Sequence, residues 1–260
     1  MSLLAISDLH VSAPGNLQAV ADIRYRPQDT LIVAGDVCED IELFELCMGL
    51  LARRFRKVIW TPGNHELWHW RGNGPRRAID RYDAFVGICQ RYNIGTPEEE
   101  SITVELAESA VQVVPIFTLY DGGFANPLQS HETKLADDAL IDPSPFGSIA
   151  ELCHALIATA EQRLCRLSGT LPRVFVSHFP LTATCAREPG HDWLAAVSGS
   201  PRTEPWIEQF APSAVVFGHQ HRPRSRVRSG VRFEEVSLGY PRDWDSRIGI
   251  EPYLRDLSLA

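Results

Sequence analysis

Long apolar runs are missing from this sequence of 260 residues, since none approaches the roughly 18 residues that a membrane span requires. The start also lacks the basic region and cleavage site of a secretion signal, because the apolar stretch LLAI follows Met1 and Ser2 directly. Together these two absences predict a cytoplasmic protein with no membrane partner.

Positive charge is scarce as well. The 25 Lys and Arg residues stand against 33 Asp and Glu, which gives a net charge of −8. Affinity for nucleic acid comes largely from neutralising phosphates, so this balance weighs against a nucleic-acid partner. One basic stretch, RPRSRVR at 222–228, stands out. Its alternation predicts the solvent face of an edge strand, with a local basic patch as the alternative.

Close cysteine pairs and phosphate-binding glycine patterns are also absent. The six cysteines are scattered, mostly in helix-like apolar patterns, which predicts buried thiols rather than disulfides or a zinc ribbon. Neither a P-loop nor a dinucleotide-binding glycine pattern occurs. What the sequence does have is 44% hydrophobic residues, enough for a sizeable core. We therefore expect one domain over residues 1–260.

Short β-rich apolar runs alternate with helical patterns, which predicts an α/β fold. The expected strands cover residues 3–7, 30–35, 57–60, 101–106, 111–117, 173–177 and 214–218. Helical spacing of apolar residues over 79–89 and 149–164 predicts two core-facing helices. Near the end, RVRSGVRFEEVSL predicts two strands joined at Ser229 and Gly230. Residues 118–147 and 179–206 are expected to be long loops of the kind that often carry function.

Residues able to bind metal follow five of these strands. The pairs of strand and following motif are LLAIS with DLH, LIVA with GD, KVIW with TPGNHE, RVFVS with H, and AVVF with GHQH. In open α/β sheets ligands bind outside the carboxyl ends of the strands, so five distant segments should converge on one crevice. Because residues i and i+2 of an extended chain share a side, we expect Asp8 and His10 to face one ion together, as can His219 and His221.

The candidate ligands offer only nitrogen and oxygen atoms. They are Asp8, His10, Asp36, Asn64, His178, His219 and His221. Seven ligands are too many for one tetrahedral site and suit two ions of higher coordination number, with manganese, iron, zinc or cobalt all admissible and calcium disfavoured. Asn64 and His65 are adjacent and should diverge. Gly35, Gly63 and Gly218 would let the backbone turn close to a bulky ion.

The five motifs, in this order and spacing, resemble the calcineurin-like metallophosphoesterase superfamily over roughly residues 4 to 221. The resemblance implies a four-layer α/β fold, a two-sheet β-sandwich flanked by helices, with a dinuclear centre at one edge. By motif position, one ion would be held by Asp8, His10 and His221. The other ion would be held by Asn64, His178 and His219, with Asp36 as the bridge.

The chemistry that this resemblance implies is hydrolysis of a phosphate ester by a hydroxide that bridges two divalent or mixed-valence ions of manganese, iron or zinc. His65 would be the catalytic donor to the leaving oxygen or a phosphoryl oxygen. Glu66 would orient a histidine rather than bind an ion. The segment GDVCED lacks the Asp-Arg-Gly arginine of the protein serine/threonine phosphatase branch, which argues against a phosphatase of that type.

Contacts with substrate are expected from aromatic and basic side chains near these motifs, namely Trp68, Arg71, Tyr120 and Arg222. Packing of the tryptophan against the sheet is the equal alternative. We expect a phosphomonoesterase acting on a small phosphorylated metabolite. The alternatives are a phosphodiesterase for cyclic nucleotides or similar diesters, and a metal-binding interaction scaffold without activity. The complete ligand set favours an enzyme over the scaffold, and the sequence leaves the oligomeric state open.

Overall fold

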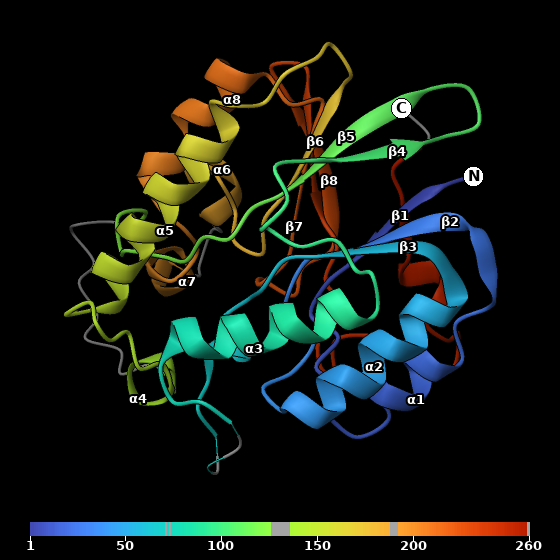
Figure 1. Cartoon of the computed structure of the whole chain (residues 1–260), viewed down its shortest axis with the longest axis horizontal. Coiled ribbons are helices and arrows are strands. Elements are labelled where there is room, and N and C mark those ends of the chain that lie inside the picture. The colour runs from blue at the N-terminus through green and yellow to red at the C-terminus, as the bar shows by residue number, and fades with distance from the viewer. Residues whose placement is uncertain (71, 73, 126–135, 188–191, 259–260) are drawn as a thin grey trace.

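Two β-sheets form the centre of the computed structural model, which describes residues 1–260 except 71, 73, 126–135, 188–191 and 259–260 (Figure 1). The first sheet, in the order β10-β1-β2-β3, contains β1 (Leu3–Ile6), β2 (Arg26–Val33), β3 (Phe55–Trp60) and β10 (Arg255–Asp256). The second, in the order β4-β5-β6-β7-β9-β8, contains β4 (Ile102–Glu105), β5 (Ala110–Pro115), β6 (Arg173–Val176), β7 (Ala214–Phe217), β8 (Arg224–Arg228) and β9 (Val231–Glu235). Strands β4, β8 and β10 pair antiparallel to their neighbours and the other pairings are parallel.

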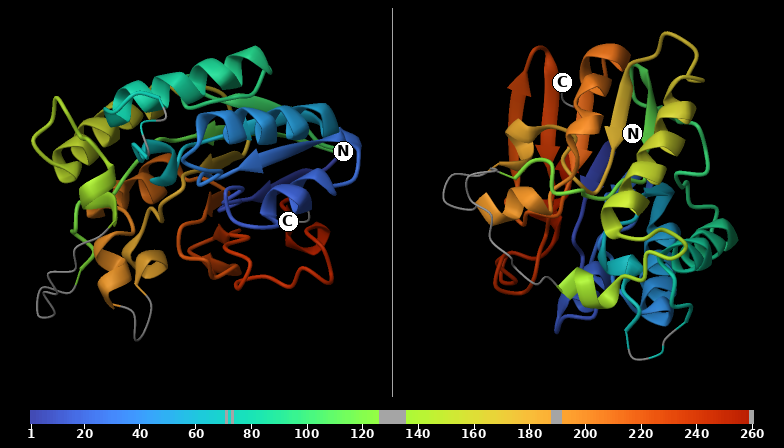
Figure 2. Two further views of the ribbon diagram at one scale, coloured as in Figure 1. Left: turned by 90° about the horizontal axis from the view of Figure 1, so that it is seen from below. Right: turned by 90° about the vertical axis from the view of Figure 1, so that its left-hand side faces the viewer.

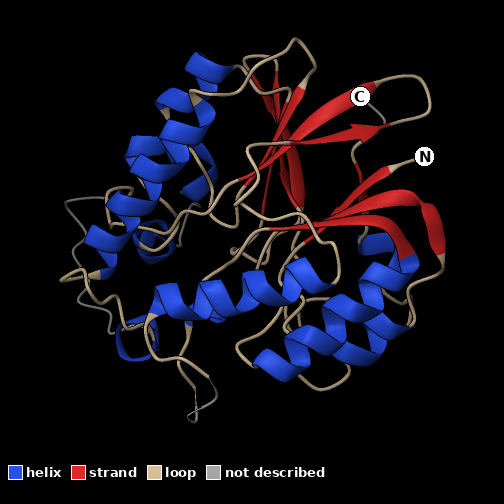
Figure 3. Cartoon of the chain, viewed as in Figure 1, coloured by secondary structure: helices blue, strands red, loops and turns tan. Residues whose placement is uncertain are grey.

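Helices lie outside both sheets (Figure 3). On the side of the first sheet lie α1 (Asn16–Ala21), α2 (Ile41–Arg54) and α3 (Ala78–Arg91) (Figure 1). Toward the second sheet lie α4 (Ala136–Leu140), α5 (Ile149–Leu164), α6 (Ala183–Ala186), α7 (Asp192–Ala196) and α8 (Pro205–Phe210) (Figures 1 and 2). Short 3-10 turns are η1 (His65–Leu67), η2 (Pro201–Thr203) and η3 (Glu251–Tyr253).

Side chains that point to opposite faces of the strands belong to two separate hydrophobic cores. Leu3 and Ala5 of β1 share one buried cluster with Val174 and Val176 of β6, so they fill the space between the sheets. Ile6 belongs instead to the larger cluster that includes the helices. Because successive side chains of a strand point to opposite faces, this pattern gives the four layers helix, sheet, sheet and helix. The predicted two-sheet sandwich flanked by helices is confirmed.

Every strand expected from the sequence is present within a few residues, and the two core-facing helices are α3 and α5. The basic stretch does form an edge strand, β8, and the two strands joined at Ser229 and Gly230 are β8 and β9. The segments expected to be loops contain short helices, namely α4 within 118–147 and α6, α7 and η2 within 179–206. Five cysteines are buried, whereas Cys165 is exposed, which corrects the expectation for that residue. Among the described residues no helix is long and apolar enough to cross a membrane.

Candidate metal centre

All seven predicted ligands lie in loops that directly follow a strand. They are Asp8 and His10 after β1, Asp36 after β2, Asn64 after β3, His178 after β6, and His219 and His221 after β7. The two sheets meet here, because the Ser7 amide donates to the Val236 carbonyl at 3.0 Å and pairs the end of β1 with the end of β9. The expected convergence of distant segments is therefore present.

The first group of ligands consists of Asp8, His10 and His221. His221 Nε2 lies 3.0 Å from His10 Nε2 and 3.2 Å from Asp8 Oδ1, and His10 Nε2 lies 3.8 Å from that oxygen. Two ligands at right angles, each about 2.1 Å from one ion, are about 3 Å apart. The spacing of this group therefore fits one metal ion.

The second group consists of Asp36, His178 and His219. Asn64 is the further ligand that the sequence motifs predict for this ion. Within the described part of the chain, Asn64 Oδ1, His178 Nε2 and His219 Nε2 are buried without a hydrogen-bond partner. His178 Nε2 also lies 3.3 Å from Asp36 Oδ2. Buried polar atoms without partners are costly, and three such atoms on these side chains fit ligands for a second ion.

Asp36 lies between the two groups. Its carboxylate approaches His178 and His219 on one side and His10 and His65 on the other. Asp36 thus belongs to two candidate groups, and its role as a bridge between two ions stays a prediction.

The ligand loops have unusual backbone angles. Five ligands have positive φ, namely Asp8 at 53°, His10 at 40°, Asp36 at 53°, His219 at 74° and His221 at 52°. Such conformations cost about 1–3 kcal/mol each for residues other than glycine and cluster at functional sites. Backbone hydrogen bonds offset this cost, for example from the Asp8 amide to the Gly35 carbonyl at 3.0 Å.

These angles correct the argument from extended spacing. Asp8 and His10 do share a group, but tight left-handed turns bring them together rather than an extended strand. His219 and His221 lie in different groups, so the expectation that they face one ion together was wrong. With Gln220 between them, both have left-handed φ values, and period-two alternation does not apply.

Glycines clear space around the carboxylates. A Cβ on Gly63 would lie 2.2 Å from Asp36 Oδ1, and one on Gly218 would lie 2.3 Å from Asp8 Oδ2. A Cβ on Gly35, which also has φ of 88°, would lie 2.6 Å from His178 Nδ1. Close approach therefore requires glycine at all three positions, as expected from the sequence.

Two histidines are oriented by hydrogen bonds on the far side of their rings. His178 Nδ1 donates to the Ala34 carbonyl at 2.8 Å, and His221 Nδ1 donates to Asp243 Oδ2 at 2.9 Å. In each ring Nε2 is left to face the candidate site, the usual arrangement of a metal-binding histidine. Asp243 was missed in the sequence because it follows none of the five strands.

The carboxylates make the site attractive to positive charge. Burial alone would lower the pKa of His178, but Asp36 and Asp8 raise it to about 10. Burial alone would also lower the pKa of His221, but Asp8 and Asp243 outweigh burial and raise it to about 9. The same carboxylates would also attract metal cations, which carry positive charge as a protonated imidazole does.

Glu66 does not orient a histidine as expected. It is fully buried, and its carboxylate accepts hydrogen bonds from the amides of Gly63 at 2.7 Å, Asp36 at 3.1 Å and Val37 at 2.7 Å. The residue therefore holds the loop after β2 against the loop after β3. Three backbone donors within reach explain why it meets the backbone rather than an imidazole.

Asp137 of α4 orients Asn64. Its carboxylate accepts from Asn64 Nδ2 at 3.2 Å, Trp68 Nε1 at 2.5 Å and the Tyr120 hydroxyl at 2.8 Å. With Nδ2 held in this way, Oδ1 of Asn64 is left buried without a hydrogen-bond partner. Tyr120 is 6% exposed and its hydroxyl serves Asp137, which corrects its assignment as a substrate contact. Trp68 is half-buried, so its contact with substrate stays a prediction.

The other two predicted substrate contacts have different outcomes. Arg71 lies outside the described residues. Arg222 directly follows His221, and its amide donates to Glu235 Oε1 at 3.2 Å. A role for Arg222 in substrate binding stays a prediction.

His65 lies beside both groups and diverges from Asn64. Its ring centroid is 4.6 Å from that of His10 and 3.7 Å from that of Trp68, and Nε2 is 3.9 Å from Asp36 Oδ2. Burial lowers its pKa, but the carboxylates of Asp36 and Glu39 outweigh burial and raise it. A raised pKa suits a group that donates a proton or hydrogen bond.

Tyr240 is a second aromatic residue at the site that the sequence did not indicate. Its ring stacks on His10 with centroids 4.3 Å apart and an interplanar angle of 14°, and its centroid is 5.1 Å from that of His221. The guanidinium of Arg242 lies 5.3 Å from the Tyr240 ring centroid. The only signal in the sequence was its place after β9, next to the end of β1.

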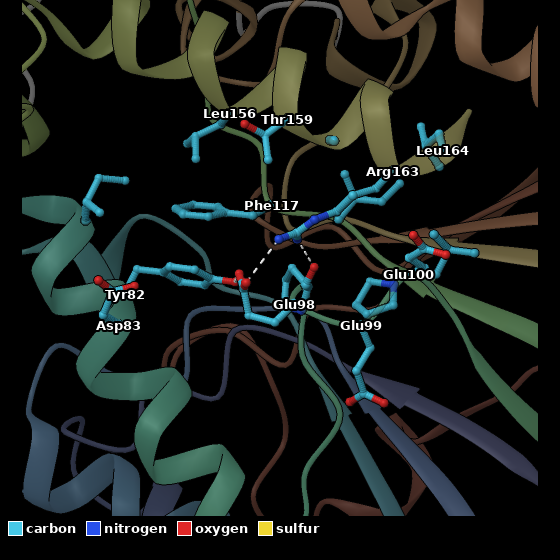
Figure 4. Close-up of a pocket in the computed structure, with 16 residues that line it drawn as sticks. Tyr82, Asp83, Glu98, Glu99, Glu100, Phe117, Leu156, Thr159, Arg163 and Leu164 are labelled. Atoms are coloured by element: carbon cyan, nitrogen blue, oxygen red, sulfur yellow. Dashed lines mark hydrogen bonds and ion pairs between the residues drawn. The ribbon is translucent and has the colours of Figure 1, made fainter. Parts of the chain in front are cut away.

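A separate hollow of about 160 Å³ lies between α3 and α5 (Figure 4). Its walls are largely apolar, and Glu98 accepts hydrogen bonds there from Tyr82 at 2.9 Å and Arg163 at 3.0 Å. None of the seven candidate ligands lines this hollow. The metal-binding chemistry therefore belongs to the strand-end loops.

Comparison with known proteins identifies the family of this chain. A family model described as calcineurin-like phosphoesterase matches residues 1–223, and the chain belongs to that family. It is therefore a metallophosphoesterase, a hydrolase that acts on phosphate ester bonds. The acyl-carrier-protein phosphodiesterase PptH of Mycobacterium tuberculosis is 37% identical over 267 residues, which cover 97% of this chain and 81% of that protein.

Solved structures give the same result. The phosphopantetheinyl hydrolase PptH from Mycobacterium tuberculosis matches with a TM-score of 0.91 and 34% identity, covering 100% of this chain and 96% of that chain. A more distant relative is a component of the nuclease SbcCD of Rhodobacter capsulatus, 24% identical over 221 residues, which cover 79% of this chain and 51% of that protein.

Proposed function

We propose that this chain is a metal-dependent phosphodiesterase that removes the phosphopantetheinyl group from an acyl-carrier protein. Similarity to PptH over nearly the whole chain supports this substrate, since that relative is described as an acyl-carrier-protein phosphodiesterase and as a phosphopantetheinyl hydrolase. The proposal replaces the expected phosphomonoester of a small metabolite. It also replaces the small phosphorylated partner with a group carried on a protein.

The proposal includes two divalent or mixed-valence ions of manganese, iron or zinc. The observation that carries it is the set of three buried ligand atoms without partners, on Asn64, His178 and His219, beside the closely spaced group of Asp8, His10 and His221. Ions bound there would polarise the phosphoryl oxygens and lower the pKa of a water nucleophile. No nucleophilic side chain is then needed.

The chain's own residues position the reacting groups. His65, next to His10 and Asp36, would donate a proton to the departing ester oxygen or a hydrogen bond to a phosphoryl oxygen. Trp68 packs against His65 and limits how far its ring can turn. Tyr240, which follows β9, packs in the same way against His10 in the loop after β1.

The proposal is tested with purified chain that is stripped of metal and reloaded with manganese, iron or zinc. Phosphopantetheinylated carrier protein is the substrate, and intact-mass measurement follows its conversion to the unmodified carrier. An aryl phosphate diester and the monoester with the same leaving group are run in parallel. We expect conversion of the carrier and preference for the diester. Rapid cleavage of the aryl monoester with no change in the carrier would refute the proposal.

A further inference from the structure

An arginine ridge, defined as Arg224, Arg226 and Arg228, runs along the edge strand β8. Alternate residues of a strand share a side, and these three lie toward α6. Arg226 Nη1 donates to the Thr184 carbonyl at 3.3 Å, and Arg228 Nη1 donates to the Thr184 hydroxyl. Arg226 and Arg228 are exposed, and β8 lies at the border of the second sheet (Figure 2).

The ridge contrasts with the charge of the whole chain. The net charge is −8, yet residues 222–233 contain five arginines and neither Asp nor Glu. The acids that follow, Glu234 and Glu235, are buried. Glu234 accepts from Ser225 Oγ at 2.9 Å, and Glu235 accepts from Ser237 Oγ at 2.6 Å. These two acids are therefore not available at the surface to a partner.

The ridge begins at the metal-binding loop. Arg224 Nη2 donates to Gln220 Oε1 at 2.9 Å, and Gln220 is the residue between His219 and His221. From Arg224 to Arg228 the strand extends about 14 Å, at about 3.4 Å per residue. A line of positive charge thus leads outward from the candidate ligands.

The outer part of the ridge borders a hollow. Its lining residues are Thr184, Cys185, Arg226, Val227, Arg228 and Phe233. Val227, on the ridge strand, is 73% exposed, which is high for a large apolar residue. Two guanidinium groups beside apolar surface suit a carboxylate side chain of a protein partner, because arginine pairs with carboxylates in a fixed planar geometry.

We propose that the arginine ridge is the docking surface for an acidic face of the carrier protein, an inference that rests on the proposed function. In the diester, one ester oxygen belongs to the carrier itself. The body of the carrier must therefore lie against the rim of the metal site, where the ridge begins. A long nucleic acid would extend past the ridge and be repelled by a chain with net charge −8. A small acidic face on a protein would contact only the positively charged ridge.

The test is the double variant Arg226→Glu with Arg228→Glu. Its matched control, Arg53→Glu with Arg56→Glu, reverses two exposed arginines where α2 ends and β3 begins, at the other end of β3 from the Asn64 loop. We expect kcat/KM for phosphopantetheinylated carrier to fall at least about tenfold in the ridge variant, with wild-type metal content and wild-type activity on an aryl phosphate diester. The control should keep both activities. Added salt should slow the wild type on the carrier and bring it closer to the ridge variant.

Each outcome separates the two proposals. Equal carrier kcat/KM in the ridge variant and the control would overturn the docking surface while leaving the proposed function standing. A wild type that cleaves the aryl diester but never the carrier would overturn both. Binding of single-stranded DNA that is lost in the ridge variant, with unchanged carrier turnover, would assign the ridge to nucleic acid instead.

Discussion

Asp243 offers the sharpest test of how the metal site is built. Its Oδ2 atom accepts from His221 Nδ1 at 2.9 Å and from the Tyr240 amide at 2.9 Å. The residue lies after the segment 1–223 that the family model matches, so no family motif includes it. Replacing it by alanine removes the acceptor that turns His221 Nε2 toward Asp8 and His10.

The size of the effect follows from this contact. Removing a partner that orients a metal-binding histidine typically weakens metal binding about 10- to 100-fold. At about 1.4 kcal/mol per tenfold change, Asp243→Ala should cost about 1.4–2.7 kcal/mol of binding free energy. The loss should be confined to the ion of the Asp8, His10 and His221 group, because Asp243 contacts none of the ligands in the other group.

Calorimetric titration of metal-free protein with manganese measures this difference. Wild type should show two bound ions, and Asp243→Ala should show one unchanged and one weakened site. Asp243→Asn is the matched control, since its amide oxygen can still accept from His221 Nδ1, and its loss should be smaller. Wild-type affinity at both sites in Asp243→Ala, or equal weakening of both, would refute the assigned role.

Three further predictions concern the fold and the reaction. Glu66→Gln replaces one of two accepting oxygens by an amide NH2 group, a donor that faces a backbone N–H. Each buried donor left unpaired costs about 1–3 kcal/mol, so urea unfolding of the metal-free protein should show a loss of stability of that size or more. The exposed substitution Glu42→Gln should show no such loss. His65→Ala should retain its metal and lose most of its rate, whereas Asp36→Ala should lose both; metal analysis beside the rate decides, and a fully active His65→Ala would remove that residue from the mechanism. A thiol reagent should label the folded chain once, at exposed Cys165, because burial shields the other five thiols and raises their pKa; a native Cys165→Ser variant that still reacts would contradict this.

Strand positions were predictable because the apolar runs are short and strongly biased. LLAI, LIVA and AVVF each end at a polar motif, and the motif marks the end of the strand. The 14-residue helix α2 (Ile41–Arg54) went unpredicted, although Asp40 caps it by accepting from the amides of Glu42 and Leu43. Strand β10, with only two residues, has no pattern that a sequence can show.

Residues that orient the ligands were harder to find than the ligands themselves. Asp243, Asp137 and Tyr240 contact the site only through tertiary packing, and none lies in a motif. Glu66 does lie in a motif, but its three backbone partners could not be deduced from spacing. Sequence spacing indicates which side chains leave a strand together, whereas the hydrogen-bond partner on the far side of a ring comes from a loop that is distant in the sequence.

The left-handed turns explain why the ligand motifs are so compact. An extended chain moves about 3.4 Å per residue, which carries alternate side chains away along the strand. Positive φ at Asp8 and His10 instead folds the chain back, so both side chains join the same group of candidate ligands from one short loop. The same geometry at His219 and His221 sends two nearby imidazoles to different groups. Strain at the strand ends thus lets five short loops supply two neighbouring groups of candidate ligands. It persists because Glu66 and the sheet hydrogen bonds fix those loops in the folded chain.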